Sequence, residues 1–155
     1  MKILLATDGS AHSNAAAEEV ARCALAPNTE VRVVSAYEIP SLILSAPLSA
    51  GNMAPTYEDA GVMARKPAED AVACAAKTIA ESHPKLSIST EVLIGSPKTA
   101  ILDEADAFGA DLIVVGSQGQ NAIERFLMGS VSQSVALHAK CSVQIVRKHN
   151  VGYNK

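Results

Sequence analysis

Aromatic side chains and positive charge are both scarce in this sequence of 155 residues. It contains no Trp, and aromatic residues make up 3% of the chain. Lys and Arg together number 13 against 16 Asp and Glu, which gives a net charge of −3 at pH 7. Proteins that bind nucleic acid need a basic surface for the phosphates, and those that bind single strands also use rings on which bases stack. We therefore expect no nucleic-acid partner.

Cysteine pairs with metal-binding or redox spacing are also missing. The three cysteines, Cys23, Cys74 and Cys141, are odd in number and widely spaced, and no C-x-x-C motif occurs. This pattern favours neither a zinc site nor a redox pair. We expect each cysteine to act as a small buried apolar residue.

Long hydrophobic runs are absent as well. No apolar stretch of the sequence reaches the roughly 18 residues that a membrane-spanning helix needs. Met1 and Lys2 lead straight into a strand-like run, without the apolar region and cleavage site of a signal peptide. We expect no membrane association and a cytoplasmic location.

Aliphatic residues are plentiful and follow an alternating pattern. Hydrophobic residues make up 48% of the chain, enough for the core of one domain, which we place at residues 1–148 with a short polar tail at 149–155. Short apolar runs predict strands, and longer periodic segments between them predict helices. The predicted strands are Ile3–Ala6, Glu30–Ala36, Leu86–Ile94, Leu112–Val115 and Val143–Val146, and the predicted helices are Ala11–Ala26, Tyr57–Ser82, Pro97–Phe108 and a segment that opens at Gly129-Ser130. This alternation predicts an α/β fold with a parallel sheet and helices on both faces.

One segment, from Tyr37 to Pro55, breaks the alternation. It is rich in Pro and Ser but also contains several Leu and Ile residues. Loops of this length are often functional, so we expect a flap that either covers a site or partner or has no specific role.

The stretch from Asp111 to Arg147 carries the strongest functional signal. Gly116 and Gly119 follow a predicted strand, and Gly129 and Ser130 open the next helix. Glycines can take positive φ and approach a ligand closely, while a helix N-terminus offers unpaired N–H groups to an anion. No Gly-Lys-Ser/Thr occurs, so this is not a Walker A loop. Turn and capping roles explain the same residues without a ligand, and the residues alone leave both interpretations open.

The spacing Gly116-x2-Gly119-x9-Gly129-Ser130 resembles the glycine signature of the nucleotide-binding branch of the universal stress protein (UspA-like) family. The opening segment Lys2–Ser10 and the closing segment Cys141–Arg147 are also similar to that family. The resemblance implies a Rossmann-like, three-layer α/β fold with an open five-stranded parallel sheet of order 3-2-1-4-5. It also implies binding of ATP, ADP or AMP, with or without Mg²⁺, and a homodimer that forms through the last strand, Ser142–Arg147.

The resemblance further implies a set of nucleotide contacts, which fall at the ends of the predicted strands and in the glycine loop. Carried over by position, they are Ala6, Asp8, Ala36, Val115, Gly116, Gly119, Gly129, Ser130 and Val131. Asp8 could accept a ribose hydroxyl or a metal-bound water, or it could serve only as a turn and capping residue. Gln118 and Gln120 stand where relatives often have a basic residue, so we expect weaker phosphate binding than the glycines suggest.

These features predict a nucleotide-responsive regulatory or protective module of the stress response. Hydrolysis should be slow at most, because the sequence offers no evident general base or arginine finger, and no catalytic set emerges around its four histidines. Two alternatives stay open: an ATP hydrolase on the same fold that uses Asp8, and a nucleotide-free module that binds a protein partner.

Overall fold

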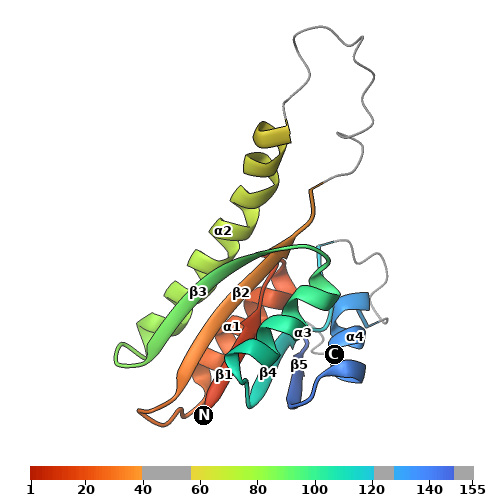
Figure 1. The fold of residues 1–155 in the computed structure, drawn as a ribbon. Helices are drawn as coiled ribbons and strands as arrows, with labels where there is room; N and C mark the ends of the chain where they lie inside the picture. Colours follow the sequence, from red (N-terminus) through yellow and green to blue (C-terminus); the bar gives the residue numbers. More distant parts are fainter. Residues whose placement is uncertain (40–56, 121–127, 149–155) are drawn as a thin grey trace, which may run out of the picture.

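The computed structural model describes residues 1–39, 57–120 and 128–148 (Figure 1), and it contains five strands and four helices in strict alternation. Their bounds are β1 (Lys2–Ala6), α1 (Ala11–Arg22), β2 (Glu30–Tyr37), α2 (Tyr57–Ser82), β3 (Ser87–Ile94), α3 (Pro97–Phe108), β4 (Leu112–Gly116), α4 (Ser130–His138) and β5 (Ser142–Val146). The predicted α/β class is therefore confirmed. Most of the expected flap and the tail from residue 149 onward lie outside the described residues.

The strands form one parallel sheet in the order β3-β2-β1-β4-β5, which confirms the order that the resemblance implied. Ile3 of β1 lies opposite Val31 of β2 on one side and Leu112 of β4 on the other. The chain builds outward from β1 in one direction and then crosses to β4 on the other side. In such sheets the crevice between these two strands, at their carboxyl ends, is the usual ligand site.

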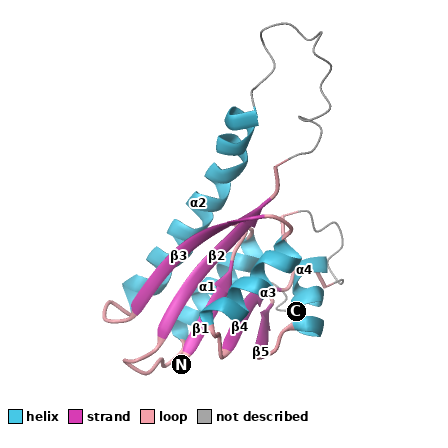
Figure 2. Cartoon of the chain, viewed as in Figure 1, coloured by secondary structure: helices cyan, strands magenta, loops and turns pink. Residues whose placement is uncertain are grey.

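Helices cover both faces of the sheet, which makes the fold a three-layer sandwich (Figure 2). Successive strand residues point to opposite faces, so Ile3 and Leu5 pack with α1 and α2 while Leu4 and Ala6 pack with α3 and α4. The central strands are buried on both sides, which explains why their sequences are continuous apolar runs. The first turns of α2 extend beyond the strand ends (Figure 1).

Helix ends differ from the prediction in one place. α1 ends at Arg22, short of the expected Ala26, because Cys23 already has extended backbone angles (φ −66°, ψ 143°). α3 begins at Pro97 and is closed by Gly109, whose φ of 68° suits a residue without a Cβ. α2 runs on through Pro67 as one helix.

None of the described helices is long and apolar enough to cross a membrane.

The expectation that every cysteine would be buried is wrong. Cys74 is exposed, and Cys23 and Cys141 are only half-buried. On α2 the buried positions around Cys74 are Val72 and Ala75, so the helical period turns Cys74 away from the sheet. Its apolar character therefore contributes nothing to the core.

Candidate functional site

A cavity of about 820 Å³ lies at the carboxyl ends of β1, β2 and β4. All of the contact residues implied by the resemblance line this one cavity, although they come from four separate parts of the chain. They are Ala6, Asp8, Ala36, Val115, Gly116, Gly119, Gly129, Ser130 and Val131. Its volume falls in the range of sites that hold small molecules and cofactors.

Residues that the sequence analysis did not select complete the walls. Ala64, Pro67 and Ala68 of α2 face the cavity from one side, and Pro97 and Ile101 of α3 also line it. The positions 64, 67 and 68 share one helix face by the i, i+3, i+4 rule. That spacing places the three side chains on one side of α2, but it does not distinguish a face toward the core from a face toward a cavity.

A hydroxyl network shapes the turn between β1 and α1. Ser10 caps α1, because its Oγ accepts the N–H of Ser13 at 3.2 Å. The buried Ser13 hydroxyl also accepts a hydrogen bond from Thr7 Oγ1 at 3.1 Å. Asp8 therefore does not cap the helix; its Oδ1 accepts the Ser10 N–H at 3.0 Å within the turn. The turn function expected for Asp8 is present, but the capping function belongs to Ser10.

Asp8 also joins this turn to the loop that follows β4. Its Oδ2 accepts the Gln120 N–H at 2.9 Å, and the Gln120 side-chain amide donates to the Asp8 carbonyl oxygen. Burial raises the pKa of the Asp8 carboxyl, but hydrogen bonds from Ser10, Ser13 and Gln120 outweigh it and hold the pKa below its ordinary value of 3.8. The carboxylate is thus charged at neutral pH.

The loop glycines serve close packing of the chain on itself. A Cβ at Gly116 would lie 2.7 Å from the backbone of His12 and of Ser13, and one at Gly119 would lie 2.7 Å from Asp8 Oδ2. At Gly129 the nearest atom would be Gln118 Cα at 3.2 Å. Within the described ranges, positive φ occurs at other glycines and not at these three. Positive φ therefore does not explain these three glycines; the strand end and the loop need them because neighbouring main chain and Asp8 occupy the Cβ position.

The N-terminus of α4 forms the opposite wall. The Gly129 N–H donates to the Ser117 carbonyl at 2.7 Å, and the buried Ser132 hydroxyl lies 3.2 Å from the same oxygen. Gly129 is the N-cap and provides no side-chain bond, while Ser130 is exposed. The first amide groups of a helix have no partner within it, and here they belong to residues that line the cavity. This end of the cavity can therefore accept an anion.

The cavity contains little charge. Of its lining residues in the described part of the chain, Asp8 is the only one with a charged side chain. His12, in the first turn of α1, does not line it, and Arg125, in the loop between β4 and α4, lies outside the described residues. No group of three or more His, Cys, Asp or Glu in the described ranges could hold a metal ion.

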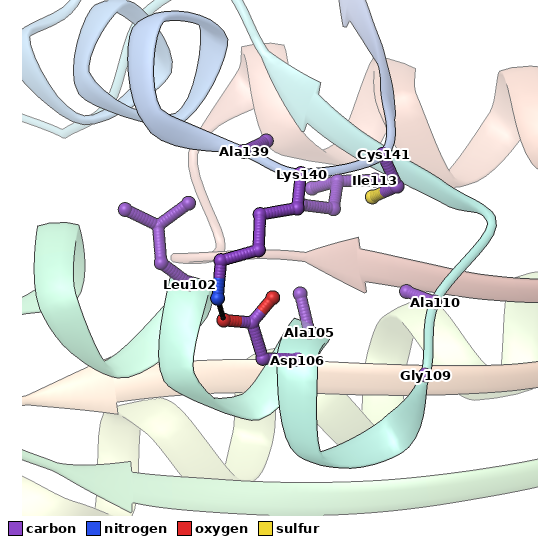
Figure 3. Close-up of a pocket in the computed structure, with 9 residues that line it drawn as sticks. All are labelled: Leu102, Ala105, Asp106, Gly109, Ala110, Ile113, Ala139, Lys140 and Cys141. Carbon is purple, nitrogen blue, oxygen red and sulfur yellow. Dashed lines mark hydrogen bonds and ion pairs between the residues drawn. The ribbon is translucent and has the colours of Figure 1, made fainter.

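A second cavity, of about 100 Å³, lies between α3 and the start of β5 (Figure 3). Lys140 Nζ lies 2.6 Å from Asp106 Oδ2 beside it, and Cys141 is part of its lining. Burial and the nearby Asp106 raise the pKa of the Cys141 thiol, so little reactive thiolate forms at neutral pH. None of the predicted contact residues lies there, and we regard it as a packing gap.

Known proteins resemble this chain in sequence. The family model for the universal stress protein family matches residues 1–147. A universal stress protein of Staphylococcus haemolyticus is 42% identical over 66 residues, which cover 42% of this chain and 40% of that protein. The match thus spans less than half the length of that relative.

Two solved structures resemble the whole fold. Universal stress protein UspA from Lactobacillus plantarum has a TM-score of 0.72 at 25% identity, with 95% of this chain and 97% of that chain covered. A universal stress protein in complex with cAMP has a TM-score of 0.65 at 28% identity, with 94% and 96% covered. Both similarities extend over all three layers of the fold.

Proposed function

Because the chain belongs to the universal stress protein family, we propose that it binds an adenine nucleotide in the cavity at the carboxyl ends of β1 and β4. The observation that carries this proposal is that all of the positions at which the resemblance implies nucleotide contacts line one cavity. A relative of 28% identity forms a complex with cAMP, which supports the same class of ligand here.

The walls of the cavity suit the three parts of a nucleotide. The phosphates would lie against the N-terminus of α4, where Gly129 and Ser130 line the cavity and amide groups and the helix dipole favour an anion. The base would lie between Ala36 of β2, Pro67 of α2 and the α3 residues. The ribose would lie near Asp8, whose carboxylate lines the cavity and accepts hydrogen bonds.

We expect regulation rather than turnover. Asp8 is the only carboxylate among the described lining residues, and its lowered pKa makes it a weak general base. Hydrolysis of ATP would therefore be slow at most. A protective or signalling function in the stress response and a cytoplasmic location follow from the family alone and stay predictions.

We also propose that β5 is the contact surface of a homodimer. It is a terminal strand of the sheet, with β4 as its neighbour on one side. Its other edge pairs with no strand of the described residues, and an edge that contains half-buried Val143 and Ile145 favours pairing with a second copy. Light scattering during gel filtration should give twice the chain mass of 16.1 kDa, and a monomer at high micromolar concentration would contradict the proposal.

The nucleotide proposal is tested on the purified full chain. Any bound small molecule is released by denaturation and identified by mass spectrometry, and AMP, ADP and ATP are then titrated calorimetrically into dialysed protein. Gly129→Val should abolish binding, because even a Cβ would lie 3.2 Å from Gln118 Cα. Gly61→Val is the matched control, since a Cβ there meets only Ile39 Cδ1 at 3.9 Å. Absence of any nucleotide binding at millimolar concentration would overturn the proposal.

A further inference from the structure

The charge balance of the cavity bears on which nucleotide it can hold. Its described lining contains the carboxylate of Asp8 and no Lys or Arg. That carboxylate is fixed in place by hydrogen bonds from the backbone N–H groups of Ser10 and Gln120, so it cannot swing away from an approaching anion. The polar residues that follow β4, Gln118 and Gln120, line the cavity as well, but an amide brings no net charge.

Among the described residues, the positive charge that faces the cavity is small. The N-terminus of α4 contributes the equivalent of roughly half an elementary charge. The nucleotides differ widely in what they bring: a cyclic monophosphate carries about one negative charge, a nucleoside monophosphate about two, and a free triphosphate about four. Half a positive charge offsets part of the charge of a single phosphoryl group, but it leaves a triphosphate largely uncompensated beside Asp8.

We propose that this cavity selects its nucleotide by charge and takes a nucleotide with one phosphoryl group in preference to a free triphosphate. The inference rests on the proposed nucleotide-binding function and narrows its ligand class. It assigns a second effect to Asp8: besides joining the β1 turn to the β4 loop, its charge disfavours each further phosphate.

The expected size follows from Coulomb's law. Two unit charges about 8 Å apart at an effective dielectric constant of about 40 interact strongly enough to change affinity roughly fivefold. Free ATP brings about two more charges than AMP, so AMP should bind at least about tenfold more tightly than ATP. Mg²⁺ removes two charges from ATP and should close most of that gap, and high salt should narrow it by screening.

The test is calorimetric titration of AMP and ATP into the full chain at pH 7.5, first with EDTA and then with Mg²⁺. Asp8→Asn should improve ATP binding several-fold more than AMP binding. Asp103→Asn, which removes the same charge from an exposed position on α3 outside the cavity lining, should change neither. Gln118→Arg adds a cation at the cavity and should also favour ATP selectively, which provides a second variant if Asp8→Asn is unstable.

The outcomes separate this inference from the function on which it rests. Equal or tighter binding of ATP than of AMP in EDTA would overturn the charge selection and leave nucleotide binding intact. A selective loss of ATP affinity in Arg125→Gln would also overturn it, because a cation outside the described residues would then supply the balance. Failure of both nucleotides to bind would overturn the proposed function and this inference together.

Discussion

Replacing Gly116 with Ala tests whether packing of the chain on itself, rather than the ligand, requires the first glycine of the loop. Gly116 is the last residue of β4 and lies against the first turn of α1. An added Cβ would lie 2.7 Å from His12 C and from Ser13 N, and 2.8 Å from His12 O. All three are backbone atoms of a helix, so no side chain can rotate to make room.

The magnitude follows from the distance that must be regained. Ordinary contact begins at 3.4 Å, so α1 must move by about 0.7 Å from the sheet on which Ala16, Ala17 and Val20 are buried. Overpacking of this kind typically costs about 1–3 kcal/mol. Ala in place of Gly restricts the unfolded chain and returns about 0.4–1 kcal/mol. We expect a net loss of about 1.3 kcal/mol, or roughly 3–5 °C in Tm for a domain of this size.

The assay is urea unfolding of nucleotide-free protein followed by circular dichroism, with the m-value checked for constancy. Two other substitutions calibrate it. Gly129→Ala meets its nearest atom at 3.2 Å, so small shifts suffice and the loss should stay below about 1 kcal/mol. Gly61→Ala lies in α2 with its nearest atom at 3.9 Å and should gain about 0.5–1 kcal/mol. The reasoning is refuted if Gly116→Ala is no more destabilising than Gly129→Ala.

Three further predictions concern single side chains. Because the folded-state pKa of Asp8 lies below 3.8, the stability that its charge contributes is complete above that pH and is lost as the pH falls through the folded-state pKa. The difference in unfolding free energy between wild type and Asp8→Asn should therefore shrink below about pH 4. Urea titrations from pH 7 to pH 2.5 measure this difference, and a constant value would contradict the prediction. Ser132→Ala removes a buried hydroxyl that donates to Gly129 O at 2.8 Å and should lower the free energy of unfolding by about 0.5–1.5 kcal/mol, whereas an unchanged urea midpoint would show that the hydroxyl is dispensable. Glu104→Ala removes the nearer carboxylate partner of the half-buried Arg32 guanidinium, at 2.5 Å, and leaves only Glu91 at 3.8 Å. It should cost about 1–2 kcal/mol, a loss that Arg32→Leu in the same background should partly reverse if desolvated charge is the cause.

The sequence predicted the strands well because each central strand is buried on both faces. Ile3–Ala6 and Leu112–Val115 are continuous apolar runs that end at turn residues, and the structure extends each by one residue. The strand order could not be predicted from the residues in the same way. Periodicity and turn signals describe one segment at a time, so the order 3-2-1-4-5 was available only through the family resemblance.

The cavity was predicted only along its strand-end and loop walls. Asp8 and Gly116 could be placed because the carboxyl ends of parallel strands meet at one edge. Pro67 and Ile101 could not, because they lie on helices whose packing angle on the sheet is not encoded in their own sequence pattern. The glycines were selected as ligand contacts, and the packing that requires Gly116 and Gly119 could not be predicted, because contacts with His12, Ser13 and Asp8, more than 100 positions earlier in the chain, leave no local signal.

The hydrogen bond from Gly129 N–H to Ser117 C=O has a consequence for how this protein could diversify. This bond places Gly129, the N-cap of α4, next to Ser117, the first residue after β4. The position of α4 is therefore set by the two ends of the loop and not by its length. Closing a loop of twice the length costs only about 0.6 kcal/mol. Evolution or an engineer could therefore exchange the residues between Gln120 and Gly129, and with them the ligand preference, while Gly119 and Gln120 keep their contacts with Asp8 and the sheet and its helices fold as before.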